Sequence, residues 1–370
     1  MTNFRIPPLP VTPDTSFPGG QPANRRAFIR GAASLGLAVG AAGMASGRLG
    51  AQEHEHASAT PGAATPGSSY VGSDASTSDS TGDATPDPTA VTPFTVYDPV
   101  LPSVQAGPKE FTVVSRDATL NVAKDVIYAG WTFDGTIPGR TLRVVEGDTV
   151  TMTVRNESQF THSLDTHAAK TPPDTNYKNL QPGEEFTWSF VAKVPGAYMY
   201  HCGTPPVLLH IGAGMYGAMI VDPKEGWPPA RELILVQSEF YFERSEEPVK
   251  VPSMSTMMLG GFMDHVVFNG HASQYVDTPI PIKVGELVRI FVVNAGPNIW
   301  SSFHVVGAIF DRAYVNGNPK NELFGLQSIS VGPGDGACVE FTVEEPGTYV
   351  AVNHAFGHAA HGAIALFQAG

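Results

Sequence analysis

Residues 200–215 read Tyr-His-Cys-Gly-Thr-Pro-Pro-Val-Leu-Leu-His-Ile-Gly-Ala-Gly-Met. In this stretch the thiol of Cys202 is followed by the imidazole of His210 and the thioether of Met215, with the spacing Cys-x7-His-x4-Met. A mononuclear blue-type copper site needs two His, one Cys and a weak axial Met, and His162 upstream supplies the missing imidazole. The stretch therefore predicts a copper site. The alternative interpretation is a Gly/Pro-rich loop with a buried Cys and two incidental histidines.

The composition indicates a large, acidic, β-rich protein. The chain has 370 residues, enough for two domains, and its 39 Gly and 32 Pro with only 15% charged residues suit many tight turns. A formal net charge of −13 argues against nucleic acid as a partner. The two cysteines, Cys202 and Cys338, are too few for a disulfide framework. Cys338 lies in a strand-like run without a neighbouring His, so we expect it to be a buried small hydrophobe.

The first 108 residues predict an export signal and a linker. Residues 24–30 read Asn-Arg-Arg-Ala-Phe-Ile-Arg and precede an Ala/Gly-rich apolar run, a pattern that resembles a twin-arginine signal. A short core or membrane helix is the alternative, but the run is too short to span a bilayer comfortably. We therefore expect a signal peptide over residues 1–51 and an exported protein, periplasmic or otherwise extracytoplasmic. Residues 52–108 are rich in Ser, Thr, Ala, Pro, Gly and Asp, which predicts a low-complexity flexible linker.

Beyond the linker the chain reads as two copies of one β-rich unit. The alternation Thr-Val-Thr-Met-Thr-Val at 149–154 is typical of a strand with one buried face. Pro-Gly-Ala-Tyr at 195–198 is matched by Pro-Gly-Thr-Tyr at 346–349, which indicates an internal repeat. The sequence thus predicts an all-β fold of two tandem Greek-key β-sandwich domains, over residues 109–222 and 223–370.

The second copy differs from the first at the thiol. Where the first reads Met-Tyr-His-Cys up to Cys202, the second reads Val-Ala-Val-Asn-His up to His354. A blue-type copper site cannot form without the thiol. The repeat nevertheless indicates that His304 and His354 stand at two equivalent places, with His304 lying 142 residues after His162.

A second metal centre follows from the directions of neighbouring side chains. His162 and His167 are five residues apart and point in different directions, as do the adjacent His201 and Cys202 if they lie on a strand. His167 and His201 would therefore face outward together. Three imidazoles with an open position are a catalytic arrangement for copper or zinc. His354 is the best third ligand, and an adjacent subunit related by cyclic symmetry is its natural donor.

Together these residues resemble the two-domain copper nitrite reductases. Residues 131–139 followed by Glu-Gly-Asp at 146–148 are similar to multicopper oxidases in general. The more specific pattern consists of His162-x2-Asp165-x-His167, His201-Cys202-x7-His210-x4-Met215 and Asn353-His354. The resemblance covers roughly residues 109–368. It implies two cupredoxin-like domains, dissimilatory one-electron reduction of nitrite to nitric oxide, two coppers per subunit with no other cofactor, and a homotrimer.

The resemblance also implies a role for each site residue. The implied acid/base residues are Asp165 and His304, although here Phe303 stands where many family members have a glycine. Val306 is the implied apolar limit on how nitrite sits. The implied partners are nitrite and a small exported electron donor of cupredoxin or cytochrome c type. The implied ligands are, for type 1 copper, His162, Cys202, His210 and Met215, and for type 2 copper, His167, His201 and, from the neighbouring subunit, His354.

Two other functions explain part of the pattern. A two-domain laccase-like multicopper oxidase needs paired His-x-His motifs and a His-Cys-His, but Gly203 follows Cys202 and the first-domain pair is spaced by five. An exported electron carrier would use the type 1 site alone and would leave the other histidines without a role. Packing is expected for the remaining methionines Met254, Met257, Met258 and Met263, and surface placement for the remaining histidines His265, His271, His358 and His361.

Overall fold

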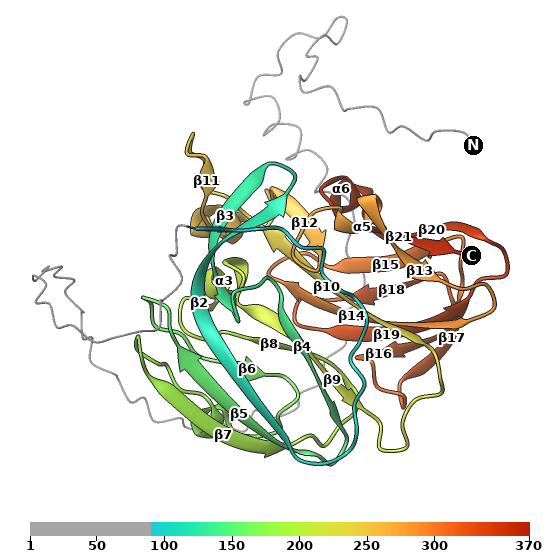
Figure 1. Ribbon diagram of the computed structural model, residues 1–370, viewed down its shortest axis with the longest axis horizontal. Coiled ribbons are helices and arrows are strands. Elements are labelled where there is room, and N and C mark those ends of the chain that lie inside the picture. The colour runs from blue at the N-terminus through green and yellow to red at the C-terminus, as the bar shows by residue number, and fades with distance from the viewer. Residues whose placement is uncertain (1–89) are drawn as a thin grey trace, which may run out of the picture. The chain divides into compact units, whose positions relative to one another are not determined.

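The computed structural model describes residues 90–370, which are mostly β-strands joined by loops and short helices (Figure 1). The predicted export signal over residues 1–51 and the predicted linker up to residue 89 lie outside the described residues. Within the described range, none of the helices has the length and apolar character that a membrane crossing requires.

The first β-sandwich packs a six-stranded sheet against a four-stranded sheet. Its strands are β1 (Val91–Thr92), β2 (Lys109–Ala123), β3 (Val126–Phe133), β4 (Gly139–Val145), β5 (Thr149–Asn156), β6 (Asp165–Thr166), β7 (Glu185–Val191), β8 (Gly196–His201), β9 (Tyr216–Asp222) and β11 (Val249–Lys250). The larger sheet has the order β11-β3-β2-β5-β7 with β1 beside β2, and the smaller has the order β4-β9-β8-β6. Consecutive strands such as β3 and β4 lie in different sheets, as Greek-key connections require.

Strand β5 shows why the larger sheet has one buried face. Val150, Met152 and Val154 are buried, whereas the threonines between them are half-buried. The three buried side chains join Trp188 and Phe190 of β7 in one hydrophobic core. Since successive side chains of a strand point to opposite faces, the alternation predicted from the sequence is confirmed here.

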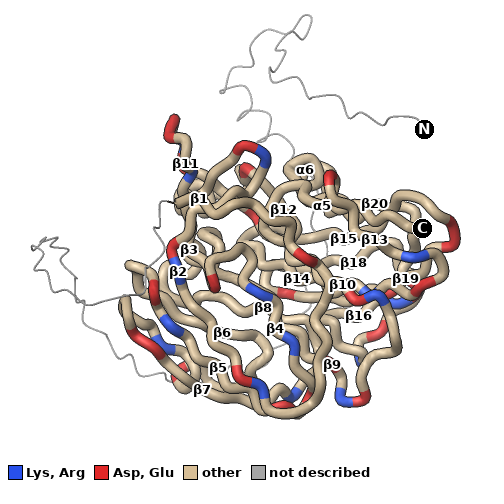
Figure 2. Tube along the Cα trace, viewed as in Figure 1, with Lys and Arg blue, Asp and Glu red and all other residues tan. Residues whose placement is uncertain are grey.

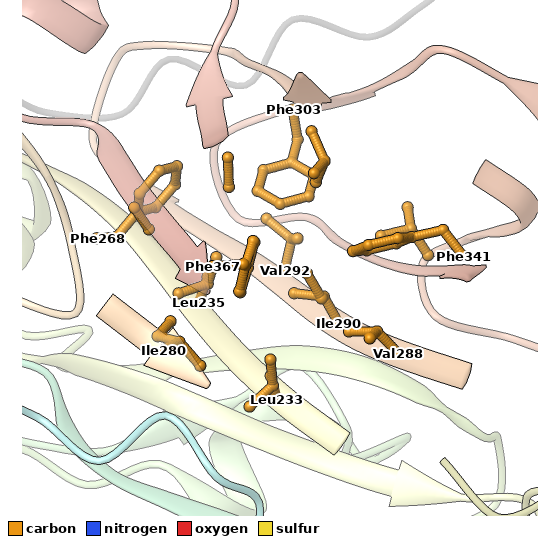
Figure 3. Packing of buried hydrophobic residues seen from close by; sticks show 14 of the residues in the cluster. Leu233, Leu235, Phe268, Ile280, Val288, Ile290, Val292, Phe303, Phe341 and Phe367 are labelled. Atoms are coloured by element: carbon orange, nitrogen blue, oxygen red, sulfur yellow. The ribbon is translucent and has the colours of Figure 1, made fainter. Parts of the chain in front are cut away.

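The second β-sandwich has the same plan. Its strands are β10 (Arg231–Phe240), β12 (His265–Phe268), β13 (Thr278–Ile282), β14 (Leu287–Gly296), β15 (Ser301–Val306), β16 (Phe310–Val315), β17 (Glu322–Leu326), β18 (Ser328–Val331), β19 (Gly336–Thr342), β20 (Gly347–Asn353) and β21 (Ile364–Ala369). A sheet of order β12-β10-β14-β19-β16-β17 packs on one of order β13-β21-β20-β15-β18. Phe303, Phe341 and Phe367 come from both sheets and meet in the core (Figure 3). The predicted fold class is confirmed.

Short helices occupy the loops beside the sandwiches. The helix α3 (Val207–Gly212) contacts α4 (Met254–Leu259), and the Ser253 hydroxyl caps α4 by accepting a main-chain N–H at 3.4 Å. Met257 is buried against α3, as packing predicts, whereas Met258 is exposed. The remaining helices are α2 (Pro173–Asn176), α5 (Gln274–Asp277) and α6 (Phe356–Ala360).

Equivalent hydrogen bonds relate the two sandwiches. Asn156 at the end of β5 donates from Nδ2 to the main-chain oxygen of Leu180 at 2.8 Å. Asn294 in β14 donates in the same way to the oxygen of Val331 at 2.9 Å. Each asparagine thus joins its strand to a later segment of the same sandwich, at Leu180 in the first and at Val331 of β18 in the second. The internal repeat predicted from the sequence is therefore confirmed.

The same comparison corrects one equivalence. In the first sandwich His162 bridges to Leu180, and in the second it is Ser301 that pairs with Val331. Ser301 therefore occupies the place equivalent to His162, and His304 lies three residues further along β15. The sequence comparison matched histidine with histidine, but strand register rather than residue type decides which positions correspond.

Residues 91–102, here called the strap, contact both sandwiches. β1 within the strap pairs with β2, and the N–H of Tyr97 donates to Oε1 of Gln274 at 2.9 Å. Leu101 is buried in the core between the sandwiches, and Tyr97 packs against it. The sequence predicted a flexible linker over residues 52–108, and for its described part this is wrong. Apolar side chains and strand pairing hold that part on the protein.

A buried ion-pair network joins the sandwiches. Arg143 of β4 lies 2.9 Å from a carboxylate oxygen of Asp222 and 2.8 Å from one of Glu232. Glu232 of β10 also lies 2.9 Å from Nη1 of Arg289, whose Nε donates to Glu340 at 2.7 Å. The network therefore connects β4 and β9 of the first sandwich to β10, β14 and β19 of the second. Along the rest of the trace, positive and negative positions are intermingled (Figure 2).

Candidate functional site

Three of the predicted ligand side chains meet beside the first sandwich. Nδ1 of His162 lies 3.1 Å from Nδ1 of His210, and Sγ of Cys202 lies 3.3 Å from His210 Nδ1 and 3.9 Å from His162 Nδ1. Cys202 directly follows β8, His210 lies in α3, and His162 precedes β6. All three side chains are buried. Their ligand atoms are close enough to one another to hold a single metal ion.

Met215 belongs to the same loop. Its side chain is fully buried, and its main chain closes the loop, because Cys202 N–H donates to Met215 O and Met215 N–H donates to His210 O, both at 3.1 Å. The indole of Trp131 packs on both imidazoles, with ring centroids 5.3 Å from His162 and 4.6 Å from His210. The loop and the indole together enclose the predicted type 1 ligand set.

The surroundings keep both imidazoles uncharged and orient one of them. Burial, with a smaller effect of the neighbouring His210, lowers the pKa of His162 to about 3, and burial lowers the pKa of His210 to about 4. Nε2 of His162 lies 2.9 Å from the hydroxyl of Ser158, which donates to Asp117 at 3.0 Å. This bond leaves His162 Nδ1 free to act as a ligand. Sequence reasoning missed Ser158 and Asp117, since no spacing in the chain marks them.

The thiol and its loop are held by neighbouring polar groups. The main-chain N–H of Ser163 donates to Sγ of Cys202 at 3.4 Å, and the Ser163 hydroxyl lies 3.7 Å from the same sulfur. The Tyr177 hydroxyl donates to the main-chain oxygen of Gly203, directly after the thiol. Hydrogen bonds of this kind fix the position of the sulfur and of the loop that carries it.

The lowered pKa values of His162 and His210 predict how the metal-free protein responds to acid. Unfolded imidazoles take up protons near pH 6.5, whereas the folded ones do so only near pH 3 to 4. The unfolded state therefore binds more protons in this window, and stability that is complete above the window is lost as pH falls through it. We expect the free energy of unfolding of the metal-free protein to fall between about pH 7 and about pH 5.

Chemical denaturation across that pH range measures this response. A matched metal-free His162→Gln variant removes one of the titrating groups and should show a shallower fall. Stability that stays constant or rises on acidification would contradict the prediction.

A second group forms on the outer side of the same strands. Nε2 of His167 lies 3.1 Å from Nε2 of His201, and Asp165 stands opposite His201 in the β6–β8 ladder. Nδ1 of His167 lies 3.1 Å from the oxygen of Gly334, and Nδ1 of His201 lies 3.0 Å from the oxygen of Cys202. These carbonyls accept from the Nδ1 nitrogens, so both Nε2 atoms are left free to bind a metal. Burial lowers the pKa of His201.

The second sandwich carries a separate pair of imidazoles. The rings of His304 and His354 lie 5.4 Å apart between centroids, and the His304 Nδ1–H donates to the oxygen of Gln327. Val306 is two residues beyond His304 on β15, on the same face of the strand, and is exposed. Within residues 90–370, the groups able to hold a metal include His167 and His201 but not His354. A single chain thus does not bring the predicted third type 2 ligand to the other two.

The remaining cysteine and histidines are explained by packing. Cys338 is buried away from both groups, as predicted, and burial raises the pKa of its thiol. The expectation of surface histidines is wrong for His265, His271 and His358, which are half-buried. His271 Nε2 lies 2.9 Å from Oδ1 of Asn121, and His358 Nδ1 lies 3.1 Å from Nδ2 of Asn353. Both partners are distant in sequence or sit in another element, so the sequence pattern did not predict them.

Known proteins share this fold and these segments. A family model described as multicopper oxidase matches residues 116–226. The copper-containing nitrite reductase of Neisseria meningitidis serogroup A is 42% identical over 245 residues, which cover 64% of this chain and 63% of that protein. The chain thus spans less than two thirds of that relative's length.

Two solved structures are similar to the chain. A copper nitrite reductase from Nitrosomonas europaea is 39% identical with a TM-score of 0.66, covering 71% of this chain and 94% of that one. A copper-containing nitrite reductase from Thermus scotoductus is 37% identical with a TM-score of 0.66, covering 71% of this chain and 62% of that one.

Proposed function

The chain belongs to the copper-containing nitrite reductases, and from this premise we propose that it reduces nitrite to nitric oxide in a dissimilatory reaction. The balanced reaction is NO2− + e− + 2H+ → NO + H2O. One observation carries the proposal: Cys202 and His201 are neighbours in the chain, yet their side chains belong to two different metal-binding groups. An electron entering at one group thus reaches the other through a few covalent bonds.

The donor set of the inner group suits type 1 copper. Metal–ligand bonds of about 2.0–2.3 Å in a trigonal plane place the ligand atoms roughly 3.5 Å apart. The atoms of His162, Cys202 and His210 are separated by 3.1 to 3.9 Å. Two neutral imidazoles, a thiol that accepts an N–H bond and the buried Met215 are the soft and borderline donors that copper selects.

The outer group suits type 2 copper if another chain completes it. His167 and His201 offer two Nε2 atoms 3.1 Å apart, and we assign the third ligand to His354 of a neighbouring subunit. His354 is exposed, and the exposed Phe356 lies 4.8 Å from it between ring centroids. Apolar side chains beside an incomplete ligand set suit burial against a second copy of the chain. A heterologous contact of this kind closes into a ring, here a homotrimer with two coppers per subunit.

The other residues of the site have separate roles in the reaction. When bound, the inner copper relays single electrons and the outer one acts as a Lewis acid that orients nitrite. Asp165, beside His201, holds a proton for the reacting oxygen, and His304 of the neighbouring subunit supplies the other. Val306, on the same face of β15 as His304, restricts how nitrite lies.

We also propose an electron donor and a location for the protein. The donor is a small exported protein of cupredoxin or cytochrome c type that approaches the loop carrying His210. The twin-arginine-like segment at residues 24–30 supports export to the periplasm or another extracytoplasmic space.

Copper stoichiometry with electron paramagnetic resonance tests this function. We expect two coppers per chain, with type 1 and type 2 signals, and a type 2 signal that nitrite perturbs. An electron carrier would show the type 1 signal alone, and a laccase-like oxidase would also contain a coupled copper pair. Lack of a type 2 signal in fully loaded protein would overturn the proposal.

The variant Asp165→Asn tests the proton donor. Because asparagine keeps the size of the side chain but cannot deliver a proton, we expect turnover to fall by about 10²-fold or more. Both coppers should stay bound, since the imidazoles of His167 and His201 keep their main-chain anchors. Steady-state nitrite reduction and copper per chain measure the two effects. Near-parental turnover at full type 2 loading would refute the role of Asp165.

A further inference from the structure

The second sandwich holds an amide where the first holds its thiol. In the first, the main-chain N–H of Ser163 donates to Sγ of Cys202 at 3.4 Å. In the second, the main-chain N–H of Ser302 donates to Oδ1 of Asn353 at 3.2 Å. Cys202 directly follows β8, and Asn353 is the last residue of β20. Register and hydrogen bonding therefore make Asn353 the structural counterpart of Cys202.

The counterpart of His210 is His358. Met215 N–H donates to the oxygen of His210 at 3.1 Å, and Ala363 N–H donates to the oxygen of His358 at 3.1 Å, so the two loops close alike. His210 directs Nδ1 to the thiol at 3.3 Å, and His358 directs Nδ1 to the amide nitrogen of Asn353 at 3.1 Å. In place of a metal-binding set, the second sandwich has a hydrogen-bonded amide and imidazole.

The side-chain amide of Asn353 cross-links four segments. Asn353 is fully buried, and its Oδ1 accepts from the main-chain N–H groups of Ser302 and Ala355, both at 3.2 Å. Its Nδ2 lies 3.1 Å from the oxygen of Trp300, 3.2 Å from Oε1 of Gln237 and 3.1 Å from Nδ1 of His358. Buried polar groups satisfied on every side in this way rigidify the elements that they join. The elements joined here are β10, β15, the turn after β20, and α6.

The turn that Asn353 holds carries His354. The N–H of His354 donates to the oxygen of Ser302 at 2.8 Å, which docks the turn on β15. His304 lies two residues further along the same strand, with its ring 5.4 Å from that of His354. The amide thus sets the relative position of the two imidazoles that the second sandwich would contribute to the type 2 centre.

We propose that Asn353 and His358 are positioning residues that fix the orientation of His354 through their hydrogen bonds. They thereby fix the part of the type 2 centre that the second sandwich contributes. These hydrogen bonds occupy the place where the first sandwich has its metal ligands. The proposal rests on the proposed function, because it takes His354 as a type 2 ligand. Neither residue contacts the metal or nitrite. Their effect passes through the orientation of His354.

Two substitutions and a conservative rescue test the proposal in the full-length protein. His358→Ala removes the acceptor that links the Asn353 amide to α6 and leaves those of Trp300 and Gln237 in place. Asn353→Asp removes the amide donors while keeping the shape of the side chain. For each, we expect type 2 copper affinity to fall by about 10–100-fold, as is usual for lost outer partners of metal ligands. His358→Gln keeps an acceptor at the side-chain end and should restore most of this affinity.

The readouts separate positioning from general damage. Copper titration and the type 2 resonance signal should change, while the visible absorption of the type 1 site stays at the parental level. His361→Ala is the matched control, because His361 lies on the same loop, is exposed and bonds instead to the oxygen of Asp264 at 2.9 Å.

Unchanged type 2 copper affinity and an unchanged type 2 signal in His358→Ala would overturn the inference. Loss of both coppers together in His358→Ala would overturn it as well. A parental protein without any type 2 signal would refute the proposed function instead.

Discussion

The variant Cys202→Ser is expected to lose the intense visible absorption of the type 1 site and to stop reducing nitrite with an external electron donor. A serine hydroxyl is a harder and weaker ligand than a thiolate, so the copper loses the soft donor that defines the site. The covalent path from Cys202 to His201 also loses its metal-bound end. No other thiol of the chain can replace that of Cys202, because the second cysteine, Cys338, is buried in the core between the sandwiches.

The type 2 centre should survive this change. His201 is oriented by the main-chain oxygen of residue 202 at 3.0 Å, and serine keeps that oxygen. Absorption spectra, copper per chain, the type 2 resonance signal and steady-state turnover together measure the result. Cys338→Ala is the matched control, since it removes the other buried thiol and should keep the colour and the turnover. Turnover near the parental rate in Cys202→Ser would refute the proposed electron path.

The variant Arg289→Met should cause the largest loss of stability that the structure predicts. Arg289 is fully buried, donates to Glu340 at 2.7 Å, lies 2.9 Å from Glu232, and has its guanidinium 4.7 Å from the centroid of the Trp227 ring. Methionine fills similar space but leaves the buried carboxylate of Glu340 without its cation. Removing one partner of a buried ion pair costs about 3–5 kcal/mol.

Chemical denaturation of the two proteins measures that cost. Arg155→Met is the matched control. Arg155 pairs with Glu185 at 2.5 Å, but both side chains are about half exposed, so the loss of this pair should cost far less than the loss of Arg289. The double variant Arg289→Met with Glu340→Gln should recover part of the stability, because it removes the stranded charge. A single variant as stable as the parent would show that the network contributes nothing to the junction of the sandwiches.

The parts of the site that could be predicted from the sequence are those whose residues lie close together along the chain. The meeting of Cys202 with His210 was predictable because both fall, with Met215, within one short stretch whose donor chemistry is specific. The sandwich class followed from alternation such as that at 149–154, which a half-buried strand requires. The histidine at position 304 was matched to the wrong position in the repeat, because strand register is not visible in residue types.

Other features have no local signature at all. The strap has the composition of a linker, but its few apolar residues, such as Tyr97 and Leu101, are enough to hold it once strands of both sandwiches are there to pack against. Ser158 and Asp117 have no signature in the sequence, because their hydrogen bonds depend on how the segment between β5 and β6 folds back on itself and packs beside β2. The role of His358 emerged only from its contact with the Asn353 amide.

The sequence by itself determined which donor atoms this protein can offer to metals and that two β-sandwiches would carry them, because ligand chemistry and period-two burial are local properties of the chain. Only the tertiary structure decided that the inner group closes within one chain whereas His354 stays apart from His167 and His201. It also decided which asparagine stands in the place of the thiol in the second sandwich. These outcomes depend on strand register and burial, which residues far apart in the sequence create together.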